Sequence, residues 1–219
     1  MFEVRLRLSK TGKLKYVSHL DMFRIMQRAV RRADIPLWYT EGFNPHPYIS
    51  FLLALSLGVE GINEPVDIRI VGEMTTAEIK DRLNKVLPAG LEITDCSLPF
   101  NKSAEIAYGA YDVWYSKEDI SSDKLFEALS SGELSCQKSG KSGRKKIMKT
   151  VNVSEHIKKF SLEEADGMIL LKVILPAGST FNLNPLQLTQ SVGDYLGISL
   201  TPVRAVRTAL LCEDLSEFR

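Results

Sequence analysis

Apolar residues recur with two different spacings along this chain, and the order of these spacings limits the folds that it can form. Alternating residues in runs such as Phe2–Leu8 predict β-strands, whereas spacings of three and four residues after Ser18 and Thr75 predict helices. The first half therefore follows the order strand, helix, strand, strand, helix, strand. Its later strands are expected at Leu37–Thr40, Val66–Val71 and Leu91–Thr94, while the apolar run Ile49–Leu57 fits neither pattern clearly.

Local signals define where the helices begin and end. Ser18-His19-Leu20-Asp21 and Thr75-Thr76-Ala77-Glu78 have the pattern of capping boxes, and Asn184-Pro185 places an N-cap before a proline at the first helical position. Pro36 ends the first helix at or before Ile35, because a proline disfavours helical backbone in the residue before it. The buried stripe of this helix is expected to contain Leu20, Phe23, Met26 or Gln27, Val30 and Ala33.

The second half repeats the order of the first. A less regular part around Ser154–Phe160 predicts an extra strand or a short helix. We therefore predict an α+β fold of tandem ferredoxin-like (βαββαβ) units, with antiparallel sheets and helices on one face. The expected domains are residues 1–98 and residues 104–219, the second with a basic hairpin insertion. In this half we expect strands at Ile106–Tyr115, Glu133–Gln137, Lys145–Val153, Met168–Leu175 and Pro202–Leu211, and helices at about Ser122–Leu129 and after Asn184.

Composition excludes several classes of protein. With 44% hydrophobic and 25% charged residues the chain is typical of a globular protein, and no apolar run approaches the roughly 20 residues that span a bilayer. The N-terminal sequence lacks the apolar core of a secretory signal, so we expect a cytoplasmic protein without a membrane partner. The three cysteines and three histidines are widely spaced, which predicts neither a disulfide framework nor a bound metal or other cofactor.

Basic residues are concentrated in two blocks, although the net charge is only +1. Residues 1–50 have nine basic and four acidic side chains and residues 138–159 have eight and one, whereas the rest of the chain is acidic. Guanidinium groups on one face of a helix suit contacts with phosphates, and the alternative is a solvated face with scattered salt bridges. In the first block, the predicted helix and the turn before it contribute Lys13, Lys15, Arg24, Arg28, Arg31 and Arg32.

The second block lies at the tip of a hairpin between two predicted strands. Its glycines make it flexible enough to follow a nucleic-acid backbone, and the alternative is a solvated tip without a ligand. The two blocks favour an anionic partner, and the hypothesis of RNA binding requires them to form one positive groove in the folded chain. The candidate RNA-binding residues of the hairpin are Lys141, Arg144, Lys145, Lys146 and Lys149.

The segment from Trp38 to Tyr48 combines aromatic residues with two prolines and a glycine, so it must be a loop. This composition favours a rigid pocket or a platform for stacked bases, and the alternative is that the rings pack the loop onto the sheet. No catalytic motif with a known spacing occurs, so the sequence predicts no catalytic residues. The candidate pocket or stacking residues are His19, Trp38, Phe43, Asn44, His46 and Tyr48.

Several runs of residues carry a resemblance to a known family. They are Gly12–Asp21 with the arginines that follow, Glu41–Pro47 and Leu57–Glu60, together with looser features at Arg144–Lys146 and Val203–Thr208. The chain resembles the radical-SAM-linked family of uncharacterised bacterial proteins, whose members occur alone or fused to a radical SAM enzyme domain. The resemblance implies a substrate-presenting partner of such an enzyme, whose three clustered cysteines this chain lacks. Asn152 departs from the acidic residue common at that position.

Three functions are compatible with these features. The first is a non-catalytic RNA-binding adaptor that positions tRNA or rRNA for a radical SAM RNA-modifying enzyme. The second is a metal-independent endoribonuclease with His19 or His46 as acid or base, since the first half is distantly similar to CRISPR RNA-processing proteins. The third is a module that binds a protein or a small molecule with the loop from Trp38 to Tyr48. The sequence favours the first, without catalytic activity of its own.

Overall fold

The chain divides into two compact units. A computed structural model describes residues 1–142, 145–178 and 181–219. The first unit comprises Met1–Ala107 and Val206–Arg219, and the second comprises Tyr108–Ala205. Both units combine helices with mainly antiparallel strands, which confirms the predicted α+β class. This division differs from the predicted domain limits because the C-terminal residues pack with the first half of the chain.

The first unit has the order strand, helix, strand, strand, helix, strand. Its sheet has the order β4-β1-β3-β2, and each of these neighbouring pairs is antiparallel. The predicted strand at Leu37–Thr40 is replaced by isolated bridges at Leu37 and Tyr39, because this segment forms one arm of a loop. The elements are β1 (Phe2–Lys10), α1 (His19–Arg32), β2 (Ile49–Phe51), β3 (Glu60–Ile70), α2 (Thr76–Asn84) and β4 (Leu91–Ser97).

The predicted helix caps are confirmed by hydrogen bonds. Ser18 Oγ accepts the backbone N–H of Asp21 at 3.2 Å, and Thr75 Oγ1 accepts that of Glu78 at 3.2 Å. Helix α1 ends at Arg32 with Ala33 as its C-cap, which agrees with the predicted end at or before Ile35. Leu20 was expected on the buried stripe but is 58% exposed, because its position in the first turn faces away from the sheet. The stripe that is buried consists of Met22, Met26, Ala29 and Val30.

One hydrophobic cluster joins the sheet of the first unit to both of its helices. Leu6 of β1 and Ile68 of β3 are fully buried in it, as are Met26 of α1 and Leu83 of α2. Because both helices contribute to the same cluster, they cover the same face of the sheet, as predicted. The opposite face of α1 is therefore turned away from the core.

The C-terminal residues complete the first unit. Strand β10 (Arg204–Leu211) pairs in parallel with β3, with Val206 opposite Glu60 and Arg207 opposite Gly61. Arg207 Nε donates to Glu64 Oε1 at 2.9 Å, and the guanidinium also donates to the carbonyl oxygen of Leu53 at 3.1 Å. A buried ion pair therefore attaches this strand to β3.

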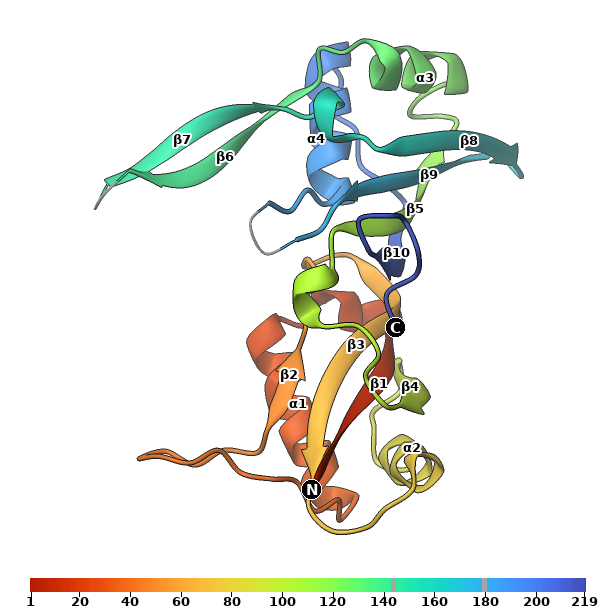
Figure 1. The fold of residues 1–219 in the computed structure, drawn as a ribbon. Coiled ribbons are helices and arrows are strands. Elements are labelled where there is room, and N and C mark those ends of the chain that lie inside the picture. The colour runs from red at the N-terminus through yellow and green to blue at the C-terminus, as the bar shows by residue number, and fades with distance from the viewer. Residues whose placement is uncertain (143–144, 179–180) are drawn as a thin grey trace. The chain divides into compact units, whose positions relative to one another are not determined.

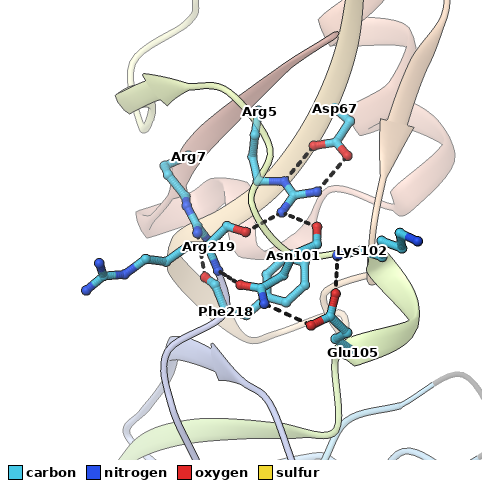
Figure 2. Close-up of polar contacts among 8 residues, drawn as sticks. All are labelled: Arg5, Arg7, Asp67, Asn101, Lys102, Glu105, Phe218 and Arg219. Carbon is cyan, nitrogen blue, oxygen red and sulfur yellow. Dashed lines mark hydrogen bonds and ion pairs between the residues drawn. The ribbon is translucent and has the colours of Figure 1, made fainter.

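A second buried ion pair lies where the C-terminal end of the chain meets β1 (Figure 2). Arg5 lies opposite Asp67 in the β1–β3 register, and its Nε and Nη2 donate to the two carboxylate oxygens at 2.7 and 2.9 Å. Its remaining nitrogen, Nη1, donates to the backbone oxygens of Asn101 and Arg219 at 2.9 and 2.6 Å. The guanidinium also lies 4.7 Å from the centre of the Phe218 ring. All three nitrogens of the guanidinium are thus engaged.

The second unit departs further from the predicted repeat. Strands β5, β9 and β8 form one antiparallel sheet, while β6 and β7 pair only with each other within the described residues. Figure 1 shows these two strands as a long hairpin that extends from the rest of their unit. The elements are β5 (Tyr108–Ser116), α3 (Ser122–Ser130), β6 (Ser135–Ser142), β7 (Lys145–Asn152), β8 (Lys159–Ala165), β9 (Met168–Pro176) and α4 (Pro185–Leu196).

Helix α4 begins as its sequence predicts. Asn184 Oδ1 accepts the backbone N–H of Gln187 at 2.9 Å, and Pro185 occupies the first turn. The hydroxyls of Tyr115 and Thr189 are 2.7 Å apart and join the helix to β5 inside the unit. Among the described helices of the chain, none has both the length and the apolar character that crossing a membrane requires.

Candidate nucleic-acid interface

Helix α1 presents its polar face away from the core because its apolar residues recur every three to four positions. Arg24 near its start is paired with Asp21, with 2.9 Å between Nη1 and Oδ1. Hydrogen bonds from Ser18 and Arg24 lower the pKa of the Asp21 carboxyl, so this carboxylate stays charged at neutral pH. Arg24 therefore contributes less positive field than its three neighbours.

The other three arginines line a groove of about 450 Å³ from the side of α1. Arg28 and Arg31 are exposed, and neither has a carboxylate within ion-pair distance among the described residues. Arg32 donates from Nη2 to the carbonyl oxygen of Val86 at 3.1 Å, so the backbone after α2 helps to hold it in place. Arg31 and Arg32 lie in the last turn of α1, where the helix dipole favours cations.

The floor of this groove is apolar and comes from two segments. Ile25 lies on α1 between the arginines and the core, and Val86 and Pro88 follow the end of α2. We call the six lining residues the arginine groove. Its rim offers charged, planar donors for oxyanions, while its floor offers no hydrogen-bonding side chain. The lining residues are Ile25, Arg28, Arg31, Arg32, Val86 and Pro88.

The two lysines predicted before α1 do not line the arginine groove. Lys13 and Lys15 lie in a 3₁₀-helix, Gly12–Tyr16, and Lys15 Nζ is 5.3 Å from the centre of the Tyr16 ring. Lys13 is exposed on the same short helix. Both add positive charge close to the start of α1 rather than to its last turn.

The loop from Trp38 to Tyr48 is a two-armed extension of the first unit (Figure 1). Its arms are joined by backbone hydrogen bonds from Tyr48 to Trp38 and from Thr40 to His46, each 2.9 Å long. The His46 ring lies within 3.1 Å of both Thr40 Oγ1 and the carbonyl oxygen of Asn44. These contacts make the loop a defined hairpin with a fully exposed Phe43 at its tip.

Arg69 of β3 holds the base of this loop. The centre of its guanidinium is 4.9 Å from the Trp38 ring centre and 4.3 Å from the Tyr48 ring centre. Burial raises the pKa of the Tyr48 hydroxyl. Two of the predicted stacking rings are therefore already engaged inside the chain, whereas Phe43 and Asn44 face solvent.

His19 lies apart from His46, against a small cavity of about 20 Å³. Its ring meets Phe51 edge-on, with 5.3 Å between the ring centres. Lys10 and Glu64 also line the cavity, and burial lowers the pKa of the Lys10 ammonium. Lys10 Nζ donates to the carbonyl oxygen of Val17 at 2.9 Å. The histidines proposed for ribonuclease chemistry thus occupy separate surroundings.

The predicted basic hairpin is formed by β6 and β7, with Lys138 opposite Lys149. Lys149 is exposed, while Lys138 turns toward the Phe181 ring, with Nζ 3.8 Å from its centre. Arg144 lies outside the described residues, as do the side chains of Lys141, Lys145 and Lys146. The hairpin belongs to the second unit and the arginine groove to the first. The single positive groove expected from the sequence therefore stays a prediction.

Residues 3–185 match the sequence profile of a family described as “Uncharacterized protein conserved in bacteria (DUF2344)”. The chain belongs to this family. The match includes every residue of the arginine groove and the whole loop from Trp38 to Tyr48, and it ends at the start of α4. This description names neither an activity nor a link to radical SAM enzymes.

A comparison with curated proteins found no match. Among solved structures, one chain in the crystal structure of a Cbf5-Nop10-Gar1 complex has a TM-score of 0.53 and 14% identity, over 95% of this chain and 49% of that one. A chain in the structure of an H/ACA RNP bound to a substrate RNA containing 2′-deoxyuridine has a TM-score of 0.47 and 12% identity, over 95% and 47%. This family member thus spans about half the length of the solved chains. The likeness at 14% identity shows the fold alone.

Sequence reasoning missed the floor of the arginine groove. Val86 and Pro88 follow α2, and nothing in their local pattern indicates that they meet α1. It also missed Arg69, whose contacts with Trp38 and Tyr48 depend on the pairing of distant segments. A partial signal existed for the floor, since the run Val86-Leu87-Pro88 places apolar residues beyond the cap of a short helix.

Proposed function

We propose that this chain is a non-catalytic RNA-binding module and that the arginine groove holds the RNA backbone. The observation that carries this proposal is the presence of three arginines around one groove, two of them without a carboxylate in range among the described residues. Exposed cations that are not neutralised within the chain attract a polyanion most strongly. The RNA is proposed to be tRNA or rRNA.

The basic hairpin is proposed as a second contact with the same RNA. Lys138 and Lys149 lie directly opposite each other on β6 and β7, and Lys138 is already engaged with the Phe181 ring and the carbonyl oxygen of Asn182. Lys149 is exposed and available for a phosphate. A groove in one unit and a hairpin in the other suit an extended or folded RNA better than a small anion.

Replacing Arg28 and Arg31 together with alanine is expected to weaken binding of tRNA by about 50-fold at about 50 mM salt. The plot of log affinity against log salt should also become shallower, by about 0.7–0.9 for each phosphate contact that is lost. Fluorescence anisotropy with labelled tRNA at several salt concentrations measures both quantities. A folded parent chain that binds no tRNA or rRNA at low salt overturns the proposal.

A matched control removes the same charge elsewhere. Lys117 and Lys172 are paired with Glu164 and Glu163, so the double change Lys117→Ala and Lys172→Ala removes two cations that are already neutralised. This variant should bind tRNA with less than about a twofold change, because paired surface cations contribute little field. An equal loss of binding in both double variants would show that net charge alone, and not the arginine groove, is responsible.

We further propose that the module serves a separate radical SAM enzyme that modifies the bound RNA. The support is the resemblance of the runs Gly12–Asp21 and Glu41–Pro47 to chains linked with such enzymes, together with the absence of clustered cysteines here. Purification of the tagged chain from its native cells should yield a protein with three closely spaced cysteines and the absorption of an iron–sulfur cluster. Adding the chain should raise that enzyme's rate on RNA at least about tenfold. An enzyme that acts equally well without the chain would refute the adaptor role.

A further inference from the structure

The floor of the arginine groove is not explained by binding of phosphates. Phosphate oxygens need donors, and Arg28, Arg31 and Arg32 supply them at the rim. Val86 and Pro88 line the groove with apolar side chains, and Pro88 is exposed although it is apolar. An apolar floor beneath charged donors suits a ligand that is itself part apolar and part anionic.

The arrangement of the side chains defines where each part of such a ligand fits. Ile25, Arg28 and Arg32 follow one another at spacings of three and four along α1, so they form one line beside the groove. Arg32 is attached to the Val86 carbonyl, which places its guanidinium beside the apolar floor. Among the residues that the structure describes, Arg28 and Arg31 have no such anchor, so both are available to phosphates. A flat apolar group on Val86 and Pro88 would thus lie beside the guanidinium groups that α1 contributes to the groove.

An unpaired nucleotide has these properties, whereas duplex RNA does not. In a duplex the bases are stacked inside, so the surface offers only phosphates and sugar hydroxyls to a shallow groove. In a single strand the base is free to lie on apolar or guanidinium surfaces while its phosphates meet cations. The groove volume of about 450 Å³ is also within the range of about 300–1,000 Å³ of sites that enclose organic ligands.

We infer that the arginine groove binds a single-stranded segment of RNA, with a nucleobase on the floor of Ile25, Val86 and Pro88 and the adjoining phosphates on Arg28 and Arg31. This inference rests on the proposed function and adds a preference for unpaired RNA. Since the floor has no hydrogen-bonding side chain, the preference depends on the presence of a base and only weakly on which base it is.

The test compares three probes on the full chain by fluorescence anisotropy. They are an oligouridylate of about 12 nucleotides, the same oligomer with stable abasic units at its centre, and a duplex RNA of equal length. The oligouridylate is expected to bind at least about tenfold more tightly than the abasic oligomer. The salt dependence of the two should be equal, because their phosphates are equal in number.

Variants of the floor locate the effect. Pro88→Ser, alone and with Val86→Thr, should reduce the tenfold preference to about twofold and leave binding of the abasic oligomer unchanged. Val71→Thr is the control for the chemical change, because Val71 is an exposed valine of the first unit that lies outside the groove, whereas Val86 is partly buried. The single Pro88→Ser change affects an exposed residue, so its result does not depend on the packing of Val86.

The outcomes separate this inference from the proposed function. Equal binding of the normal and abasic oligomers, or tighter binding of the duplex, would overturn the inference while RNA binding itself stands. Failure of all three probes and of tRNA to bind would remove the proposed function. A preference for the base-bearing oligomer that survives both floor variants would also overturn the inference, because the base would then lie elsewhere.

Discussion

Replacement of Asp67 by alanine is expected to lower the free energy of unfolding by about 3–5 kcal/mol. Its carboxylate receives two hydrogen bonds from Arg5, and the two side chains are only 6% and 2% exposed. Without Asp67 the guanidinium would remain buried against the backbone oxygens of Asn101 and Arg219 and the Phe218 ring, without the carboxylate that accepts two of its hydrogen bonds. Removing one partner of a buried ion pair lowers stability by more than the intact pair contributes to it, because the remaining charge stays buried away from water.

Urea titrations followed by circular dichroism measure this loss. Asp81→Ala is the matched control, because it removes an exposed aspartate from α2 of the same unit and should change stability by less than about 0.5 kcal/mol. The double change Arg5→Leu and Asp67→Leu should cost less than Asp67→Ala alone, since neither charge is then left unpaired. A double variant as unstable as the sum of its single variants would show that the two residues act independently.

The helix starts were predictable from the sequence because helix caps are local. Ser18, Thr75 and Asn184 each accept a hydrogen bond from a backbone N–H three residues later, and the residues that make this possible are adjacent in the chain. The end of α1 was predicted only as a limit, at or before Ile35, and the structure agrees with this limit. Pro36 defines the last position at which the helix can end. The helix ends four residues before Pro36, at Arg32, and Asp34 then adopts a positive φ of 52°.

The buried charges were not predictable, because their partners are distant in sequence. Strand β3 begins at Glu60 rather than at the predicted Val66, and the missed part includes Glu64, whose polar character hides its burial. Its partner Arg207 is 143 positions away. The same holds for Arg5 and Asp67, which are 62 positions apart. A local pattern shows the charge of a residue and gives no information on such a partner.

The burial of these charges changes how the basic block in residues 1–50 contributes to binding. Arg5, Arg7 and Lys10 are counted in that block, yet all three are buried and engaged inside the first unit. The positive charge that reaches solvent is therefore concentrated on α1 and on the 3₁₀-helix before it. The helical spacing correctly predicted that the four arginines share the polar face of α1. Because Arg24 is paired with Asp21, most of the positive charge that this face presents to solvent lies on the last turns of the helix.

Replacement of Glu64 by alanine is expected to destabilise the first unit by about 3–5 kcal/mol at neutral pH, since its side chain is 7% exposed and that of Arg207 is 2% exposed. Glu64 also acts electrostatically on Lys10, whose pKa is lowered by burial and raised again in part by this carboxylate. Without Glu64 the pKa of Lys10 should fall further. In the unfolded chain the Lys10 amine keeps its proton up to about pH 10.5, whereas in the folded chain it loses the proton at a lower pH. Between these two pKa values the unfolded state binds more protons than the folded state. The stability of the folded state therefore rises with pH across this interval.

The free energy of unfolding that Glu64→Ala loses relative to the parent chain should therefore become smaller as the pH is raised from about 7 to 10. Urea titrations at several pH values measure this difference. In the background of Lys10→Met this difference should no longer vary with pH, because the titrating amine is gone. Glu163→Ala is the control, since its partner Lys172 is exposed and the pair contributes little to stability. Amide hydrogen exchange in 206–211 should accelerate in Glu64→Ala alone, because β10 loses its ionic attachment to β3. If the loss of stability caused by Glu64→Ala is independent of pH both with Lys10 and with Lys10→Met, then Glu64 compensates the charge of Arg207 and not that of Lys10.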